Sequence, residues 1–400
     1  MTVEERLPEE STARTSEITL ASIFRVALFY GVAGFGGGYS VLAQLRRDLV
    51  ERRRWLSAEE FLVLAELSKS LPGTPATSLL ALLGQRVGGA RAGVVAAVAF
   101  LLPSAIMMTA CGAAYSIMRK ATGLTLFFDG MNAAMVGVVG AVTVDLGRAA
   151  LRSWRDVIVA ILCAVLLASH TVSEPILALG AALLGGIVGA RVAKRAAAIS
   201  KDGSPKSERL HSFPLPLFLM AGGGFTILAA LVRVFVPIGV ATFGGGLAMI
   251  PAIEHTVVIE RHWLDAKAFA DAIALGQITP GPVAICATFI GYRVAGILGA
   301  IVATVAMFGP AIILALVVGH SIQRFHESPI VAGALRALAP AVIGMLAAAT
   351  FSLARAGIDG RLGAAVAVLT FLLLVRFAVS PLWPLVGGGV AHVLLSLLTR

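Results

Sequence analysis

The chain of 400 residues is short of charge, and this scarcity limits the class of protein it can be. Only 14% of its residues are Asp, Glu, Lys or Arg, whereas 58% are hydrophobic before its 43 glycines are counted. A typical soluble domain is roughly 45–50% apolar with glycine included. Apolar runs such as 92–118 exceed the ~20 residues that a helix needs to cross a bilayer. We predict an all-α polytopic membrane protein, because no alternating pattern indicates a barrel.

Motifs of the common enzyme classes are missing as well. The three cysteines, Cys111, Cys163 and Cys286, lie in apolar stretches without CxxC spacing and are expected to be buried thiols. The sequence has no GxxxxGK[ST] loop, and Tyr39 stands where GxGxxG requires its third glycine. The histidines lack metal-ligand spacing. We therefore expect no enzyme, no cofactor and no metal.

The acidic tail and the basic loops give information about the location and membrane orientation of the chain. Residues 1–17 are polar and acidic, which predicts a solvent-exposed tail and not a cleaved export signal. The net charge of +10 comes from Lys and Arg in short loops between apolar spans. This pattern indicates membrane orientation and no nucleic-acid partner.

Two related halves make up most of the chain. The stretch "FRVALFYGVAGFGGGYSVL" (24–42) is echoed by "VRVFVPIGVATFGGGLAMI" (232–250), a shift of 208 residues. After the loss of one residue, a shift of 207 pairs "GQRVGG" (84–89) with "GYRVAG" (291–296). This register predicts a duplication, with repeats over 18–190 and 213–400. They are joined by a flexible linker, 191–212, rich in Ser, Lys and Gly.

Each half is predicted to contain the same series of helices. A first apolar helix (18–34 and 225–242) ends at FGGG, and a short polar helix follows. An amphipathic helix (57–70 and 264–278) is then broken at Pro-Gly, because proline removes a backbone donor and glycine disfavours helix. The helix resumes to about 88 or 295. Further spans are expected at 92–118, 124–147, 157–170 and 172–190, and at 297–318, 330–352, 362–378 and 381–398.

The count of crossings and the loop charges predict how the halves are oriented. If each broken hairpin returns to its own side, each half crosses an odd number of times and the second half is inverted. Loop 46–54 holds five arginines against one in its counterpart 254–263. This places loop 46–54, loop 148–156 and the linker in the cytoplasm. We favour inverted repeats, although Arg355 and Arg361 then lie outside, and an extra crossing at 213–224 would make the halves parallel.

The doubled motif resembles a known family. Two copies of FGGG, each followed by an amphipathic helix, a Pro-Gly break, G-[YQ]-R-x-x-G and a proline-bearing span, resemble the long, two-domain form of the chromate ion transporter family. The resemblance covers about 18–398. It implies a bacterial inner-membrane transporter that exports chromate, coupled to protons, confers chromate resistance and has sulfate as a competitor. It also supports the inverted arrangement.

The first half departs from the family pattern. It has "SKSLPGTP" (68–75) where the second half has "GQITPGP" (276–282), so that Lys69 replaces Gln277 and Thr74 replaces Pro282. The substrate is therefore less firmly implied than the fold. Transport of sulfate or another small anion, a passive anion channel and a structural membrane subunit remain alternatives.

The glycines at the breaks are the predicted anion ligands. A broken helix leaves unpaired N–H groups at the start of its next segment, where the helix dipole adds about half a positive charge. Glycine lets an anion approach the backbone closely. The predicted ligands are Gly36, Gly37, Gly38, Gly73, Gly244, Gly245, Gly246 and Gly281. In the alternative interpretation, the glycines only allow helices to pack closely.

Cations at equivalent positions of the two halves are predicted to assist. Intramembrane ionisable residues are costly and usually functional, and a guanidinium holds two oxygens of an oxyanion at once. The predicted set is Arg25 with Arg233, Arg86 with Arg293, and Lys69 with its counterpart Gln277. Alternatively, Arg86 and Arg293 extend to the membrane interface and Lys69 is solvated.

Coupling to protons needs a carboxylate that titrates within the membrane. Asp129 and Asp145 are the first candidates, followed by Glu66 and Asp271 on the amphipathic helices. Asp145 lies near a span end, where an interfacial ion pair is the alternative. The expected partners are chromate or a sulfate-like oxyanion, protons, the lipid bilayer and, as an open possibility, a second copy in a homodimer.

Overall fold

The computed structural model describes residues 18–34, 38–71, 73–169, 177, 180–181, 183–188, 190–191, 226–241, 246–247, 249–320, 329–377 and 379–398. Its regular elements within these ranges are all helices, so the predicted all-α class is confirmed. The predicted tail 1–17, most of the linker 191–212, the stretch 213–224 and the glycines Gly36, Gly37, Gly244 and Gly245 lie outside the described residues.

The described elements of the first half recur in the same order in the second half, which also contains a 3₁₀ turn and α16. The first half contains α2 (Leu20–Ala33), α3 (Gly38–Arg46), a π-helical segment (Arg47–Arg52), α4 (Ala58–Ser70), α5 (Pro75–Met118), α6 (Thr122–Ala150) and α7 (Trp154–Ala168). The second contains α9 (Thr226–Ala241), α10 (Ile250–Glu254), a π-helical segment (His255–Glu260), α11 (Ala266–Ile278), a 3₁₀ turn (Val283–Ile285), α12 (Cys286–Gly319), α14 (Pro329–Gly357), α15 (Gly360–Phe377) and α16 (Leu382–Leu398).

Local backbone geometry repeats with the sequence. Arg54 and His262 are 208 residues apart and share a positive φ, 53° and 52°. The amphipathic helices also start alike: Ser57 caps α4 in a capping box with Glu60, and the Asp265 side chain accepts from the Ala268 N–H of α11. The duplication seen in the sequence is thus a duplication of structure.

The G-[YQ]-R-x-x-G motif forms the turn of a helical hairpin. α5 reverses at Gly88-Gly89 and α12 at Ala295-Gly296, and Gly89 and Gly296 have φ of +77° and +63°. The two arms lie in direct contact, because a side chain at Gly84 would meet the Ala92 carbonyl. The last glycine of the motif therefore makes the turn, and the first lets the arms approach.

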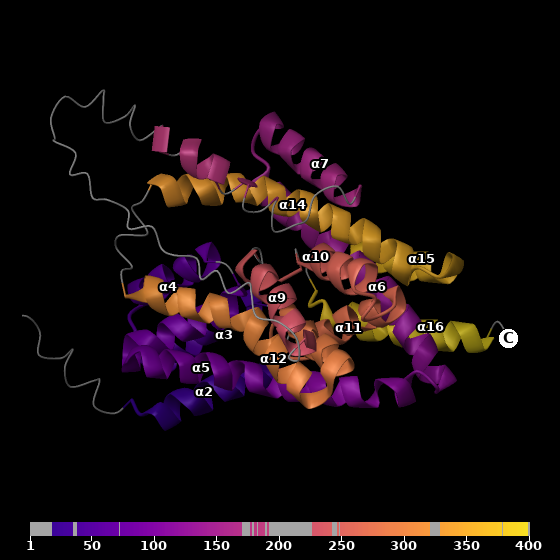
Figure 1. Cartoon of the computed structure of the whole chain (residues 1–400), viewed down its shortest axis with the longest axis horizontal. Helices are drawn as coiled ribbons and strands as arrows, with labels where there is room; N and C mark the ends of the chain where they lie inside the picture. The colour runs from indigo at the N-terminus through magenta and orange to yellow at the C-terminus, as the bar shows by residue number, and fades with distance from the viewer. Residues whose placement is uncertain are drawn as a thin grey trace, which may run out of the picture.

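The two halves are inverted, as predicted. Gly112, near the end of α5, lies against Tyr292 beside the turn of α12. Gly319, at the end of α12, lies against Gln85 beside the turn of α5. Each hairpin turn is therefore next to the far end of the other half's long helix, and α5 and α12 run side by side in opposite directions (Figure 1).

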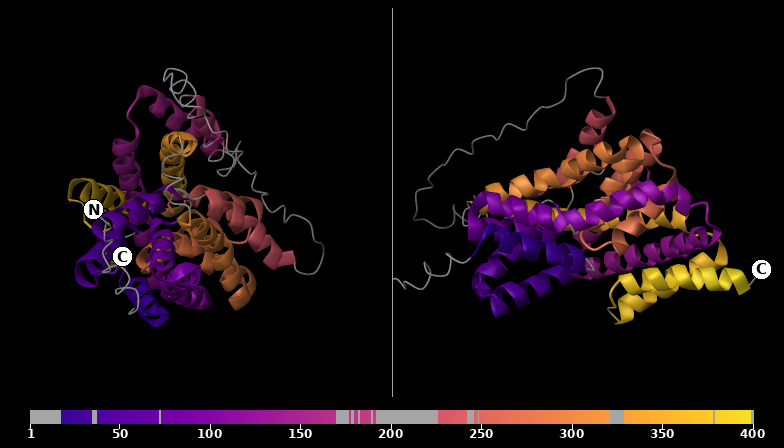
Figure 2. Two further views of the ribbon diagram at one scale, coloured as in Figure 1. Left: turned by 90° about the vertical axis from the view of Figure 1, so that its left-hand side faces the viewer. Right: turned by 90° about the horizontal axis from the view of Figure 1, so that it is seen from below.

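The carboxyl-terminal helices of each half pack on the other half. Gly137 of α6 lies against Ala367 and Thr370 of α15, and its counterpart Gly344 of α14 lies against Ala160 and Cys163 of α7. α16 also packs on α6, and α6 packs on α14 (Figures 1 and 2). The halves therefore form one interlocked bundle.

Five described helical stretches are long and apolar enough to cross a membrane. They are Pro75–Met118, Thr122–Arg148, Val283–Gly319, Arg336–Gly357 and Gly360–Phe377. The chain is therefore a multi-pass membrane protein. The end of the bundle with the Gly88-Gly89 turn also holds loop 46–54, since Leu49, Trp55 and Val87 line one small cavity; we call it the arginine-rich end.

Candidate functional site

The helix breaks of both halves meet at the centre of the bundle. The N–H of Gly281 donates to the carbonyl oxygen of Gly34 at 3.2 Å, and Gly246 faces the methyl group of Thr74. Gly73, Gly246 and Gly281 have φ of +104°, +91° and +110°, which side chains rarely permit. Gly281 lies against Ser104, halfway along the long arm of α5. The breaks therefore meet beside the middle of the long arm of α5.

The start of α5 supplies hydrogen-bond donors to this meeting point. Thr74 precedes the helix and Pro75 opens it, and the Thr74 side chain caps no backbone N–H. Its Oγ1 instead pairs with Thr77 Oγ1 at 2.8 Å. Ser78 is buried and, among the described residues, its Oγ has no hydrogen-bond partner. A helix N-terminus with a spare buried hydroxyl is suited to an anion.

Other polar groups lie near the breaks. Ser104 is fully buried and its hydroxyl donates to the Leu101 carbonyl at 3.0 Å. Gln277 is half-buried, one turn before Gly281, and its Oε1 has no hydrogen-bond partner in the described part of the chain. Neither Ser78 nor Ser104 is among the residues predicted from the sequence. The available signal for Ser78 was a hydroxyl about one turn after a Pro-Gly break, whereas Ser104 lies in the middle of α5 and had no such signal. Gly38 is the first residue of α3.

The predicted arginines of the first helices do not reach the breaks. Ile23, Val26 and Ala27 form the buried face of α2, and Arg25 is exposed on another face. Arg233 is likewise exposed on α9. The equal spacing of Arg25 and Arg233 from FGGG predicts their position along the helix axis. It gives no information about which face of the helix they occupy.

The other predicted cations have different surroundings. The Arg86 guanidinium pairs with Glu60 at 2.6 Å, and that of Arg293 lies 5.4 Å from the centre of the Tyr115 ring. Both arginines are exposed beside hairpin turns, which favours the interfacial interpretation. Lys69 is exposed on α4 and pairs with Glu66 at 2.8 Å, so the structure does not bring Lys69 to the buried breaks.

Asp271 is fully buried on α11, and polar side chains of the first half surround its carboxylate. Its Oδ2 accepts from the Tyr115 hydroxyl at 2.6 Å and from Arg119 Nε at 2.8 Å. Its Oδ1 accepts from Asn132 Nδ2 at 2.7 Å. Because three side chains of the first half donate to one carboxylate of the second, the network holds α11 to α5 and α6.

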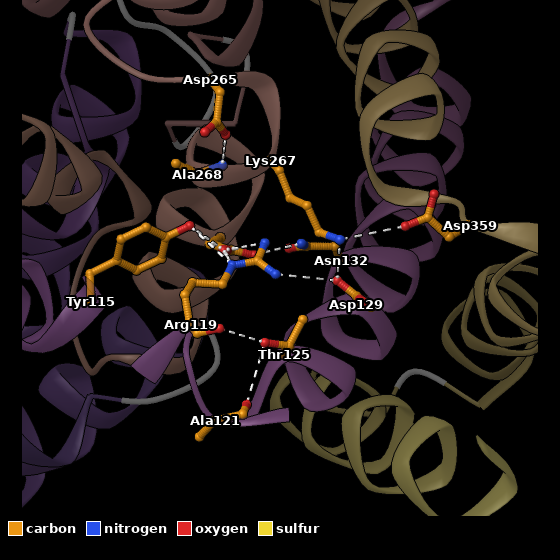
Figure 3. Close-up of polar contacts among 11 residues, drawn as sticks. Tyr115, Arg119, Ala121, Thr125, Asp129, Asn132, Asp265, Lys267, Ala268 and Asp359 are labelled. Atoms are coloured by element: carbon orange, nitrogen blue, oxygen red, sulfur yellow. Dashed lines mark hydrogen bonds and ion pairs between the residues drawn. The ribbon is translucent and has the colours of Figure 1, made fainter. Parts of the chain in front are cut away.

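Asp129 extends the network toward the surface. Its Oδ1 lies 3.0 Å from Lys267 Nζ and 3.6 Å from an Arg119 terminal nitrogen. Lys267 also approaches Asp359 at 3.7 Å (Figure 3). We call this end of the bundle the Asp271 end. The sequence placed Asp129 and Asp271 among titratable candidates; their joint partner Arg119 was missed because the contact joins different halves.

The remaining carboxylates predicted to couple protons lie elsewhere. Asp145 is exposed near the end of α6, and Glu66 is exposed on α4. Asp129 is the member of the predicted set that is mostly buried but still accessible to solvent, with 14% of its side chain exposed.

Comparisons with known proteins were made on the whole chain. Residues 21–189 and 229–393 each match the family model described as Chromate transporter. A chromate transport protein of Cupriavidus metallidurans is 30% identical over 380 residues, which is 92% of each chain. A probable chromate transport protein of Synechococcus elongatus is 31% identical over 346 residues, 84% of this chain and 85% of the relative.

A shorter relative matches a single portion of the chain. An uncharacterized transporter of Bacillus subtilis is 32% identical over 133 residues, which is 33% of this chain and 66% of that protein. No solved structure matches the chain.

Proposed function

The chain belongs to the chromate transporter family, and we propose that it exports chromate from the bacterial cytoplasm across the inner membrane and so confers chromate resistance. The observation that carries the proposal is the central meeting of the helix breaks, where Ser78 presents a buried hydroxyl that has no partner among the described residues. A transporter needs a substrate site near the middle of the membrane, and broken helices provide the usual backbone ligands there.

The proposed site binds an oxyanion through neutral donors. The N-terminus of α5 supplies backbone N–H groups and a favourable dipole, and Thr74, Thr77 and Ser78 supply hydroxyls. The glycines at 73, 246 and 281 let the anion approach the backbone. Sulfate has the same charge and tetrahedral shape, so we propose that it competes for the site.

We propose Asp129 as the carboxylate that couples transport to protons. Protonation would release its hold on Lys267 and Arg119 and so loosen the joint between the halves. Glu66 and Asp145 remain predicted alternatives.

Transport into proteoliposomes tests the function. Purified protein is reconstituted, and labelled chromate is followed with an imposed pH gradient, without one, and with excess sulfate. The expected result is concentrative uptake that requires the gradient and is reduced by sulfate. Flux that runs only downhill would instead indicate a passive channel, and protein-free liposomes provide the background.

A further inference from the structure

The amphipathic helices of the two halves are packed differently, although the long helices α5 and α12 make equivalent contacts. The contact of Gly112 with Tyr292 has a counterpart, since the shift of 207 residues converts it into the contact of Gly319 with Gln85. The scaffold of α5 and α12 therefore has the same packing at both ends of the bundle.

The helices α4 and α11 show this difference. On α11, Ala270, Asp271 and Ala274 are buried against neighbouring helices. Their counterparts on α4, at a shift of 208 residues, are Leu62, Val63 and Glu66, which are 53%, 41% and 58% exposed. The Asp271 end is thus closed around α11, and the arginine-rich end leaves α4 uncovered.

The ribbon agrees with this burial pattern. α11 packs on α6, α14 and α16 at the Asp271 end, whereas α4 packs on α5 and α3 at the arginine-rich end (Figure 1). In an inverted-repeat transporter, exchanging the conformations of the two repeats converts one open side into the other. The contacts of the closed end therefore predict contacts that the open end makes when it closes.

Three contacts at the closed end have complementary counterparts at the open end. Lys267 pairs with Asp129 and with Asp359, and the hydroxyl of Ser352 donates to Glu254. The shifts of 207 and 208 residues convert these contacts into Glu59 with Arg336, Glu59 with Arg152, and Asp145 with Arg46.

The signs of these counterparts are informative. In the two Lys267 pairs, glutamate takes the place of lysine and arginine takes the place of each aspartate. Both pairs therefore remain attractive although every charge in them is reversed. A change at one position alone would have placed like charges together, which is unfavourable. Glu59, Arg152, Arg336, Arg46 and Asp145 are all exposed, and no ion pair joins these five residues in the described structure.

We propose that Glu59 with Arg152 and Arg336, together with Asp145 and Arg46, forms a second gate, which closes the arginine-rich end when the Lys267 pairs separate. Its role in moving an anion rests on the proposed transport function. The two gates close in turn. When the second gate is closed, α4 lies relative to α14 and α7 as α11 lies relative to α6 and α15 in this structure. In the open state, Arg152 and Arg336 present positive charge that attracts an anion to the entrance.

The buried pair of Asp271 and Asn132 has apolar counterparts at the arginine-rich end. Asp271 has Val63 as its counterpart, and Asn132 has Ala339. The Asp271 end therefore has additional hydrogen bonds that stabilise its closed state, and removing contacts there shifts the population toward closure of the other end.

Disulfide cross-linking in membranes tests the second gate without chromate. The three native cysteines are replaced by alanine, and one chain carries Glu59→Cys with Arg336→Cys. A second chain carries Asp129→Cys with Lys267→Cys as the matched control. Copper phenanthroline is the oxidant. We expect the control pair to cross-link, and the yield of the 59–336 pair to rise several-fold when Lys267→Ala is added.

Two outcomes would overturn the proposal: no 59–336 cross-link in either background while the control pair reacts, or an equal yield with and without Lys267→Ala. Charge reversal gives a second measurement. Glu59→Lys should abolish transport, and adding Arg152→Asp and Arg336→Asp should restore it. If cross-linking responds as expected but chromate is not transported, the gate stands and the proposed substrate fails.

Discussion

Thr143 of α6 and Thr350 of α14 place their hydroxyl oxygens 3.4 Å apart, and each is the other's counterpart at a shift of 207 residues. A residue meets its own equivalent only where a two-fold axis passes. Both hydroxyls also donate to the carbonyl four residues earlier, of Val139 and Leu346. The pair therefore marks the pseudo-two-fold axis that relates the halves.

Substitution of Gly281 by alanine should impair both the fold of the break and transport. Alanine at a φ of +110° is strained by about 1–3 kcal/mol, and its methyl group would lie 3.0 Å from Ser104 Oγ. We expect a lower thermal midpoint and a loss of chromate uptake. Gly123→Ala is the control, because a side chain there meets nothing within 4 Å. Equal uptake by the two variants would contradict a role for the break.

Ser78→Ala should weaken binding and leave stability nearly unchanged. The Ser78 hydroxyl has no partner among the described residues, so its removal orphans no protein group there. A hydrogen bond to a charged ligand is worth about 1.5–3 kcal/mol, so the KM for chromate should rise at least roughly tenfold. Thr109→Ala, which removes a hydroxyl bonded to the Ala105 carbonyl, is the comparison. If Ser78→Ala transports with an unchanged KM, the oxyanion binds elsewhere.

Asp271→Asn should destabilise the protein far more than the loss of an exposed carboxylate. The substitution leaves the Arg119 guanidinium without its closest carboxylate, and removing one partner of a buried pair costs about 3–5 kcal/mol. Glu66→Gln removes the acid of an exposed pair, which is worth about 0–1 kcal/mol. Thermal unfolding of both variants in the same detergent measures the difference. Comparable midpoints would show that the network does not hold α11 in place.

Asp129→Asn should uncouple chromate movement from the pH gradient. An amide does not titrate, so the hold on Lys267 no longer responds to protons. Uptake into proteoliposomes at several imposed gradients is the measurement, and we expect the slope of uptake against gradient to vanish. Asp145→Asn, at the opposite end of α6, is tested in parallel. Loss of the slope in that variant alone would transfer the coupling role to Asp145.

Elements whose cause is local could be predicted from the sequence. The bounds of α4 and α11 agree closely with 57–70 and 264–278, because a capping residue starts each helix and a Pro-Gly break ends it. The predicted ends of the resumed helices near 88 and 295 agree with the turns at Gly89 and Gly296, where glycine ends an apolar run. The faces occupied by Arg25 and Arg233 could not be predicted in this way, because their neighbours come from distant segments.

The partners of the charged residues depended on contacts between the halves. Lys267 and Asp271 lie on α11, whereas Arg119 follows α5. No spacing in the sequence relates Asp271 to Tyr115, 156 residues away. Burial of these charges is tolerable because each has an opposite charge or a donor beside it, and that pairing exists only after α11 docks on α5 and α6.

The sequence by itself determined the membrane class, the duplication and the positions of the breaks, because apolar length, internal repetition, proline and glycine act on the chain locally. The tertiary structure decided which residues surround the central meeting point, which end of the bundle is closed and which charges are paired. These properties depend on packing between inverted halves, where the same face is buried on α11 and exposed on α4.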